Sequence, residues 1–294
     1  MGAPRTILRE DPGFPARLRL VRDPPAFLRV RGDLGEAGAR RVAVVGSRHS
    51  DDYGLAMARA LGRDLARAGV SVVSGGADGV DAAAHEGALA AGGHTVAVLG
   101  CGVDVVYPAH HDRLFARILA AGGALCAEYE DGTRPTTFSF PRRNRIVSGM
   151  SEAVVVVRCG AKSGALLTAG SARRQGVPVF AVPGEAGDPL SEGPLGLLRG
   201  GARLATGARD VLLALGLGEQ LPLPSVERGA AALPAGEAAL FAALGRSPRH
   251  AEEVGREAGL RPGDALAGLL SLEMQGLCEQ RPGNYFLRRE TGSA

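Results

Sequence analysis

The chain has 294 residues, 45% of them hydrophobic, and carries a formal net charge of only +3. This length suggests about two domains, the apolar content excludes global disorder, and the weak charge bias does not by itself indicate a nucleic-acid partner. No apolar run reaches the ~18 residues of a membrane span, and no signal-peptide core follows Met1, so we expect a cytoplasmic protein.

From residue 41 onward, short apolar runs alternate with helical patterns. Apolar runs separated by helices are typical of a mostly parallel sheet covered on both faces, which predicts a Rossmann-like α/β domain over residues 41–217 after a lead-in over residues 1–40. The patterns do not give the strand order. In chain order they predict strands at Val42–Val45, Val70–Val73, Thr95–Leu99, Ala124–Glu128, Ala153–Val157 and Val177–Val182, and helices at Tyr53–Arg67, Asp81–Ala91 (with Asp81 as N-cap), Asp112–Ala121 and Ser163–Gln175.

The composition changes after Leu217. Residues 218–233 are rich in Gly, Pro, Leu and Ala without periodicity, which predicts a linker. Three short helices and then two strands around the turn Arg281–Asn284 follow, and this is the plan of a winged helix. We therefore predict a small winged-helix-like module over residues 234–294, with helices at Glu237–Leu244, Ala251–Ala258 and Pro262–Gln275.

Glycine-rich turns follow several predicted strands, at the edge where parallel sheets bind ligands. Glycine lets a ligand approach the backbone, and a helix N-terminus offers unpaired N–H groups that attract anions. No dinucleotide-binding or Walker A motif is complete; Ala161, for example, stands where a Walker A loop has glycine. The turns predict an anion-binding rim formed by Gly46, Ser47, Arg48, Ser74, Gly75, Gly76, Lys162, Ser163, Gly164 and Thr168.

The segment Phe138–Ser148 interleaves aromatic and basic side chains. Arginine suits phosphate contacts, and an aromatic face can stack a base of any sequence. Beside an anion-binding rim, this pattern favours an unpaired nucleic-acid strand; the alternative is a solvated arginine turn with its phenylalanines in the core. The residues assigned to binding here are Phe138, Phe140, Arg142, Arg143, Asn144 and Arg145.

Nothing in the sequence marks a catalytic, cofactor or metal centre. His110 and His111 are adjacent in a loop, so we expect them to point apart as exposed polar residues. Glu128 and Glu130 flank Tyr129 without a partner acid or a nucleophile beside a base. The four cysteines are scattered without a CxxC pair, so we expect reduced thiols and neither a zinc site nor a disulfide framework.

Together these motifs resemble the DprA/Smf family, the DNA-processing proteins of bacterial transformation. The resemblance runs in order from about Phe14 to Leu215. It implies an extended Rossmann-like domain that binds single-stranded DNA without sequence preference, protects incoming DNA and loads the RecA recombinase, and it implies a homodimer. The matching motifs are Gly46-Ser47-Arg48, Ser74–Asp81, Ala97–Asp104, Tyr107-Pro108, Phe140–Ile146, Ser163–Ala169 and Ala181–Gly184.

The sequence departs from the family pattern in places. Arg158 stands where relatives often carry Glu, Gly193-Pro194-Leu195 stands where many have Asn after Gly, and we expect the helical SAM-like domain of relatives to be absent. A small-nucleotide sensor or a phosphoribohydrolase-like enzyme on a related fold is the alternative. The Pro-Gly-Gly-x-Gly-Thr loop of those hydrolases does not occur here, and the arginines near Phe140 favour a polymer.

Overall fold

The computed structural model describes residues 3–217, 233–245, 247–274 and 277–288. The chain divides into two compact units, Met1–Leu221 and Pro222–Ala294. Residues 218–232 of the predicted linker lie outside the described residues. None of the described helices is long and apolar enough to cross a membrane.

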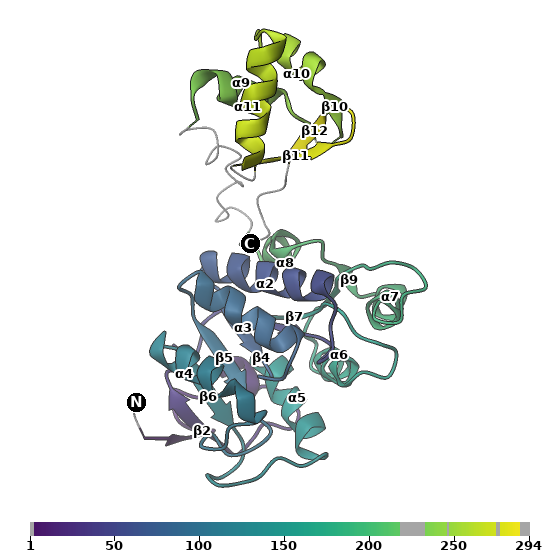
Figure 1. The fold of residues 1–294 in the computed structure, drawn as a ribbon. Helices are drawn as coiled ribbons and strands as arrows, with labels where there is room; N and C mark the ends of the chain where they lie inside the picture. The colour runs from purple at the N-terminus through teal and green to yellow at the C-terminus, as the bar shows by residue number, and fades with distance from the viewer. Residues whose placement is uncertain (1–2, 218–232, 246, 275–276, 289–294) are drawn as a thin grey trace. The chain divides into compact units, whose positions relative to one another are not determined.

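A single mixed sheet forms the centre of the first unit (Figure 1). Its order, among the described strands, is β1-β2-β6-β5-β4-β3-β7-β8-β9. The neighbours from β6 to β9 pair in parallel, whereas β1 with β2 and β2 with β6 are antiparallel. The mostly parallel sheet is as predicted. The strands are β1 (Arg5–Leu8), β2 (Phe27–Gly32), β3 (Arg41–Val45), β4 (Ser71–Ser74), β5 (Thr95–Val98), β6 (Ala124–Ala127), β7 (Ala153–Val156), β8 (Val179–Ala181) and β9 (Arg203–Leu204).

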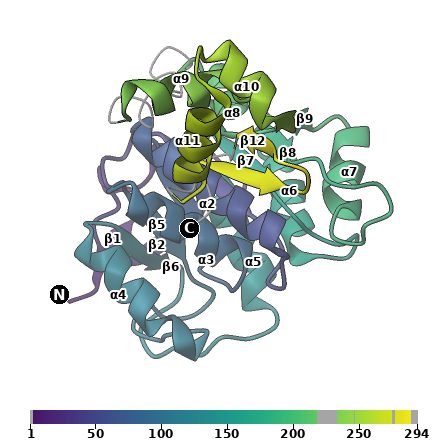
Figure 2. The same cartoon turned by 45° about the horizontal axis from the view of Figure 1, so that its top comes forward.

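Helices cover both faces of the sheet, as predicted. Alternate side chains of each strand point to opposite faces, so Val42 and Val44 contact one helical layer and Ala43 and Val45 the other. The first layer consists of α2 (Asp52–Arg67), α3 (Val80–Ala90), α4 (Asp112–Ala120) and α8 (Ala208–Ala214), and the second of α1 (Ala16–Arg19), α5 (Ser139–Gly149), α6 (Gly164–Arg174) and α7 (Glu192–Arg199). In Figure 2 the long α2 lies beside α3.

The segment predicted as a lead-in over residues 1–40 is part of this unit. Strand β2 pairs with β6, with Val30 opposite Cys126. The buried guanidinium of Arg41 donates to the carbonyl oxygens of Leu34 at 2.7 Å and Glu36 at 2.7 Å, which fixes the connection into β3. Residues 27–32 alternate half-buried and buried side chains, as a strand near a sheet edge does, so the lead-in contributes strand β2 to the sheet.

Two local predictions also need correction. Helix α3 begins after Gly79, and Asp81 accepts hydrogen bonds from the preceding loop instead of capping the helix. Helix α5 begins at Ser139, so the arginines of the segment Phe138–Ser148 lie on a helix and not in the turn considered as the alternative. Pro141 is compatible with this start because the first turn of a helix does not need its N–H.

The second unit has its own hydrophobic core and the predicted winged-helix plan. Leu240, Val254, Leu269 and Phe286 are buried together. The short strand β10 adds a third strand beside β12, which the sequence patterns did not indicate. The elements are α9 (Ala235–Ala243), β10 (Arg249–His250), α10 (Ala251–Glu257), α11 (Pro262–Met274), β11 (Cys278–Arg281) and β12 (Tyr285–Arg288).

Candidate nucleic-acid interface

A groove of about 700 Å³ opens at the carboxyl ends of the neighbouring strands β3 and β7. Strand β3 leads to α2 on one face and its neighbour β7 leads to α6 on the other, so the loops after them diverge. Such a switch point at the carboxyl ends of parallel strands is where α/β sheets bind ligands. Of the predicted binding residues, those lining the groove are Gly46, Ser47, Arg48, Gly75, Phe140, Arg143, Asn144, Lys162, Ser163, Gly164 and Thr168.

One wall of the groove consists of an arginine side chain packed on one aromatic ring, which in turn contacts a second aromatic ring. The guanidinium of Arg48 lies 5.0 Å from the ring centroid of Phe140, and the ring of Tyr107 lies 5.5 Å from the same ring. Arg48 is exposed and forms no ion pair among the described residues. Beneath it a pocket of about 50 Å³ is bounded by Gly76 and Leu99. Tyr107 was not among the predicted site residues, although its place in the glycine-containing loop that follows β5 was a usable signal.

The opposite wall is the N-terminus of α6. Ser163 caps the helix by accepting a hydrogen bond from the N–H of Ala165 at 3.3 Å. Lys162 and Gly164 are exposed beside it, and Asn144 donates to the Gly164 carbonyl at 3.2 Å, which links α5 to this turn. A helix N-terminus next to a lysine attracts anions through both the helix dipole and the ammonium charge.

Arg143 lies beneath the groove and shapes its floor. Its buried guanidinium donates to the carbonyl oxygens of Gly75 and Val98, and Asp81 accepts from the N–H of Gly75 at 3.0 Å. Burial lowers the pKa of Arg143, with Asp81 opposing this, and burial raises the pKa of Asp81. Ser74 is likewise buried and donates to the carbonyl of Val44 at 2.6 Å. The structure therefore places both predicted phosphate ligands below the surface.

Gly75 is required at this position by local packing and not by the approach of a ligand. A Cβ at Gly75 would lie 2.5 Å from the guanidinium nitrogens of Arg143. Gly76, with φ of +66°, adopts a left-handed conformation that other residues rarely take. The Gly75-Gly76 pair thus leaves room for a buried arginine and a sharp turn.

Besides the buried Ser74, and Gly76 in the smaller pocket, three predicted residues do not line the groove. Arg145 pairs with Glu128 at 2.5 Å and with Asp23 at 3.2 Å, and Arg142 pairs with Glu128 at 3.2 Å. Burial raises the pKa of Glu128, and the two arginines oppose that shift. Phe138 is 86% exposed and does not line the groove. The charge of Arg145 is balanced within the protein.

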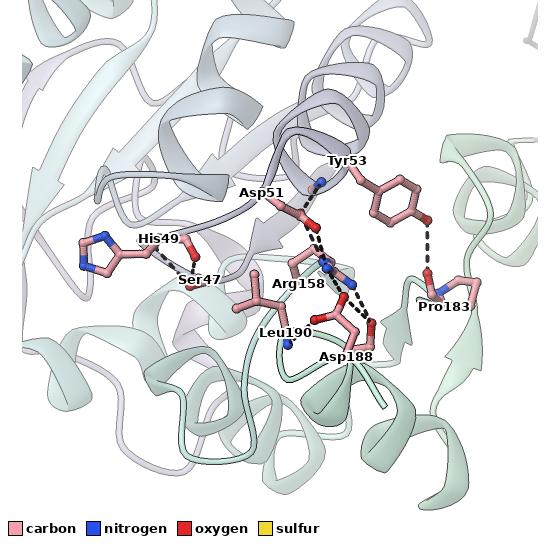
Figure 3. A network of polar contacts seen from close by, with 10 residues as sticks. Ser47, His49, Asp51, Tyr53, Arg158, Pro183, Asp188 and Leu190 are labelled. Atoms are coloured by element: carbon pink, nitrogen blue, oxygen red, sulfur yellow. Dashed lines mark hydrogen bonds and ion pairs between the residues drawn. The ribbon is translucent and has the colours of Figure 1, made fainter. Parts of the chain in front are cut away.

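A buried arginine holds the rim together beside the groove (Figure 3). Arg158 donates to the carboxylates of Asp51 and Asp188, and its backbone carbonyl accepts from the N–H of Ser47 at 2.6 Å. Its guanidinium lies 5.6 Å from the ring of Tyr53, whose hydroxyl donates to the Pro183 carbonyl at 3.0 Å. Arg158, one of the departures from the family pattern, thus joins the loops after β3, β7 and β8.

Asp51 has a second role as the N-cap of α2. Its carboxylate accepts from the N–H of Gly54 at 2.9 Å. Burial alone would raise its pKa, but the bonds from Gly54 and Arg158 outweigh burial and lower the pKa. Ser47 in the same loop accepts at Oγ from the N–H of His49 at 3.1 Å. The start of the loop is therefore fixed by its own hydrogen bonds.

The prediction that His110 and His111 point apart is wrong. Both follow β5 in the short 3-10 helix η1 (Ala109–His111), and their Nε2 atoms converge on Asp78 Oδ1, at 2.7 Å and 3.1 Å. His111 is also buried, not exposed. Adjacent positions on a 3-10 turn diverge less than those on a strand, which the sequence reasoning did not consider.

Comparison with protein families gives two matches. Residues 5–216 match the model of the DNA recombination-mediator protein A family, and residues 224–284 match the DprA winged helix domain. The Protein Smf of Escherichia coli strain K12 is 39% identical over 284 residues, which cover 94% of this chain and 75% of that protein.

Solved structures agree with this assignment. The X-ray structure of DNA processing protein A from Streptococcus pneumoniae is similar with a TM-score of 0.66 and 36% identity, over 71% of this chain and 74% of that one. The same protein of Helicobacter pylori, described for its unique single-stranded DNA binding mode, has a TM-score of 0.63 and 29% identity over 72% of this chain and 95% of that one. The chain therefore belongs to the DprA/Smf family of DNA-processing proteins.

Proposed function

We propose that the groove between the loops after β3 and β7 binds single-stranded DNA without sequence preference. The observation that carries this proposal is that the exposed Arg48, packed on Phe140, and the N-terminus of α6 line the same groove. A cation and a helix N-terminus bind phosphates of any sequence, and aromatic rings stack any base. The single-strand binding described for the Helicobacter pylori relative supports the same role here.

In this proposal each wall has a separate task. Arg48 and Lys162 neutralise phosphates, and the first turn of α6 donates backbone hydrogen bonds to another. Phe140, with Tyr107 behind it, offers a face to one base. Arg143 contributes indirectly, because it holds the Gly75 loop in place.

Fluorescence anisotropy with labelled oligonucleotides tests the proposal. Affinity should fall with salt, with a log–log slope of roughly −0.7 for each neutralised phosphate, and Arg48→Ala or Lys162→Ala should make the slope shallower. Phe140→Leu should weaken binding by ~1–3 kcal/mol without changing the slope, since no charge is lost. Arg142→Ala is the matched control, because Arg142 is exposed but pairs with Glu128 outside the groove.

The outcomes separate the alternatives. Equal affinity for oligo-dT and mixed sequence is expected, because phosphates carry no sequence information. If Arg48→Ala and Lys162→Ala both bind like the wild type with unchanged slopes, the strand binds elsewhere. If mononucleotides bind and oligonucleotides do not, a small-nucleotide sensor replaces the proposal.

As a recombination mediator, the chain is further proposed to protect the bound strand and deliver RecA onto it, acting in the cytoplasm as a homodimer. The family description as a recombination mediator supports this role. RecA should displace a single-strand-binding protein faster when this chain is present, measured by ATP hydrolysis on coated DNA. No acceleration would contradict the mediator role. Light scattering that gives a monomer at micromolar concentration would contradict the dimer.

A further inference from the structure

The cluster of Asp78, His110 and His111 lies beside the DNA groove but is not needed for the proposed phosphate contacts. Asp78 follows β4 and the two histidines follow β5, so neighbouring strands bring them together. The candidate ligand atoms of the three side chains all lie within 4.8 Å of one another. We propose that these three residues bind a divalent transition-metal ion of the zinc class.

The hydrogen bonds of His111 fix which nitrogen faces the carboxylate. Its Nδ1 lies 3.0 Å from the backbone carbonyl of Gly76, which can only accept, so Nδ1 carries the proton. In the neutral imidazole, Nε2 then holds a lone pair directed at Asp78 Oδ1, 3.1 Å away. Either a proton on Nε2 or a metal ion bound beside both atoms satisfies this contact, and the metal titration below distinguishes the two.

A backbone carbonyl behind the ring is also the usual support of a metal-binding histidine. It fixes the tautomer and orientation and raises the basicity of the other nitrogen. His111 is held further by edge-to-face contact with Phe115, with ring centroids 5.9 Å apart. Its Nε2 is thus a preorganised ligand.

The spacing fits a small ion with short bonds to nitrogen. Metal–ligand distances of ~2.0–2.1 Å in a tetrahedral zinc site separate neighbouring ligand atoms by roughly 3.3 Å. The His111–Asp78 separation of 3.1 Å is close to this value, and the His110–Asp78 separation of 2.7 Å must widen slightly. The His110 side chain is 67% exposed and has room to move.

The ligand types select the class of metal. Two imidazoles and one carboxylate suit zinc, cobalt and nickel, whereas magnesium and calcium prefer oxygen ligands throughout. Three protein ligands leave one position of a tetrahedral ion for water or another ligand. Cobalt(II) is therefore a suitable probe, since it takes the same ligands and is visible by absorbance.

The test uses the full, untagged chain, stripped with a chelator and free of DNA, so that its result does not depend on the proposed DNA binding. Cobalt is titrated by visible absorbance and zinc by calorimetry, each expected to saturate near one ion per chain. Asp78→Asn and His110→Ala remove ligands that are not buried, so the fold should persist, which circular dichroism checks. Each should weaken metal binding at least about ten-fold, because losing even a residue that only orients a metal ligand costs this much.

His49→Ala is the matched control: His49 is exposed and outside the cluster, so this variant should bind metal like the wild type. Magnesium at millimolar concentration should not compete. The inference is overturned if the wild type binds neither ion. It is equally overturned if Asp78→Asn and His110→Ala bind both ions with wild-type affinity.

Discussion

Replacing Arg143 tests whether this residue supports the Gly75 loop from below or contacts DNA directly. In Arg143→Ala, the carbonyls of Gly75 and Val98 lose their donor and the Asp81 carboxyl is left buried without its cation. An unsatisfied buried group costs ~1–3 kcal/mol, and two buried carbonyls lose their donor here. We expect a loss of about 3–5 kcal/mol, a large part of a typical domain stability of ~5–15 kcal/mol.

Urea denaturation measures this loss, with Arg142→Ala as the control. Arg142 is exposed, so its removal should cost at most ~1 kcal/mol. A double-mutant cycle with Asp81→Asn should show that the two losses are not additive, with a coupling of ~0.5–3 kcal/mol.

The pH dependence provides a second check on the same variant. Burial raises the pKa of Asp81, and without Arg143 nothing nearby opposes that shift as strongly. The folded state then keeps the Asp81 proton to a higher pH than the unfolded state does. Stability of Arg143→Ala should therefore fall as the pH rises above about 4, the usual pKa of an unfolded aspartate.

One result would refute this reasoning. If Arg143→Ala unfolds at the same urea concentration as the wild type, yet binds oligonucleotide weakly with a shallower salt slope, Arg143 contacts phosphate directly. The buried guanidinium would then not represent the DNA-bound protein.

Three further predictions follow from other contacts. Burial raises the pKa of the Cys126 thiol to about 12 and that of the Cys101, Cys159 and Cys278 thiols to about 11. A thiol reagent at pH 8 should therefore label the native chain slowly and the denatured chain fast, and rapid labelling of the native chain would contradict this. Arg158→Ala removes hydrogen bonds to two partly exposed carboxylates and should destabilise the first unit by ~1–3 kcal/mol at neutral pH. Since Arg158 helps lower the pKa of Asp51, this loss should shrink as the pH falls below about 4, and a pH-independent loss would count against the pairing. Deleting residues 234–294 should leave oligonucleotide affinity within a few-fold, because α11 carries Asp264 and Glu273 and no basic residue, and a hundred-fold loss would show that the module binds the strand.

Periodicity and turn residues were enough to predict most of the fold. The apolar runs at β3 and β7 are continuous because both faces of these strands are buried, and this pattern identifies a covered parallel sheet. The cap at Ser163 was equally readable, because its side chain acts on the neighbouring backbone. Local signals of this kind do not depend on the strand order.

What could not be predicted depends on contacts between distant residues. Arg143 and Arg145 look alike in sequence, but one meets Gly75 and Val98 and the other meets Glu128. The partners that each arginine meets depend on the strand order, and the sequence patterns do not give that order. The convergence of His110 on Asp78 has the same origin, since it depends on β4 and β5 being neighbours.

The pairing of β3 with β7 also has a consequence for synthesis of the chain. Val42 pairs with Ala153, so Arg48 and the first turn of α6 come from parts of the chain that leave the ribosome far apart in time. A nascent chain that ends before β7 can already pair β3, β4, β5 and β6 but lacks the α6 wall of the groove. A strand of DNA held by both walls would join an early half to a late half. At a DNA concentration of 100 Kd, binding would stabilise the folded domain by ~2.7 kcal/mol. Bound DNA would therefore hold the early and late parts of the chain together only after synthesis of the domain is complete.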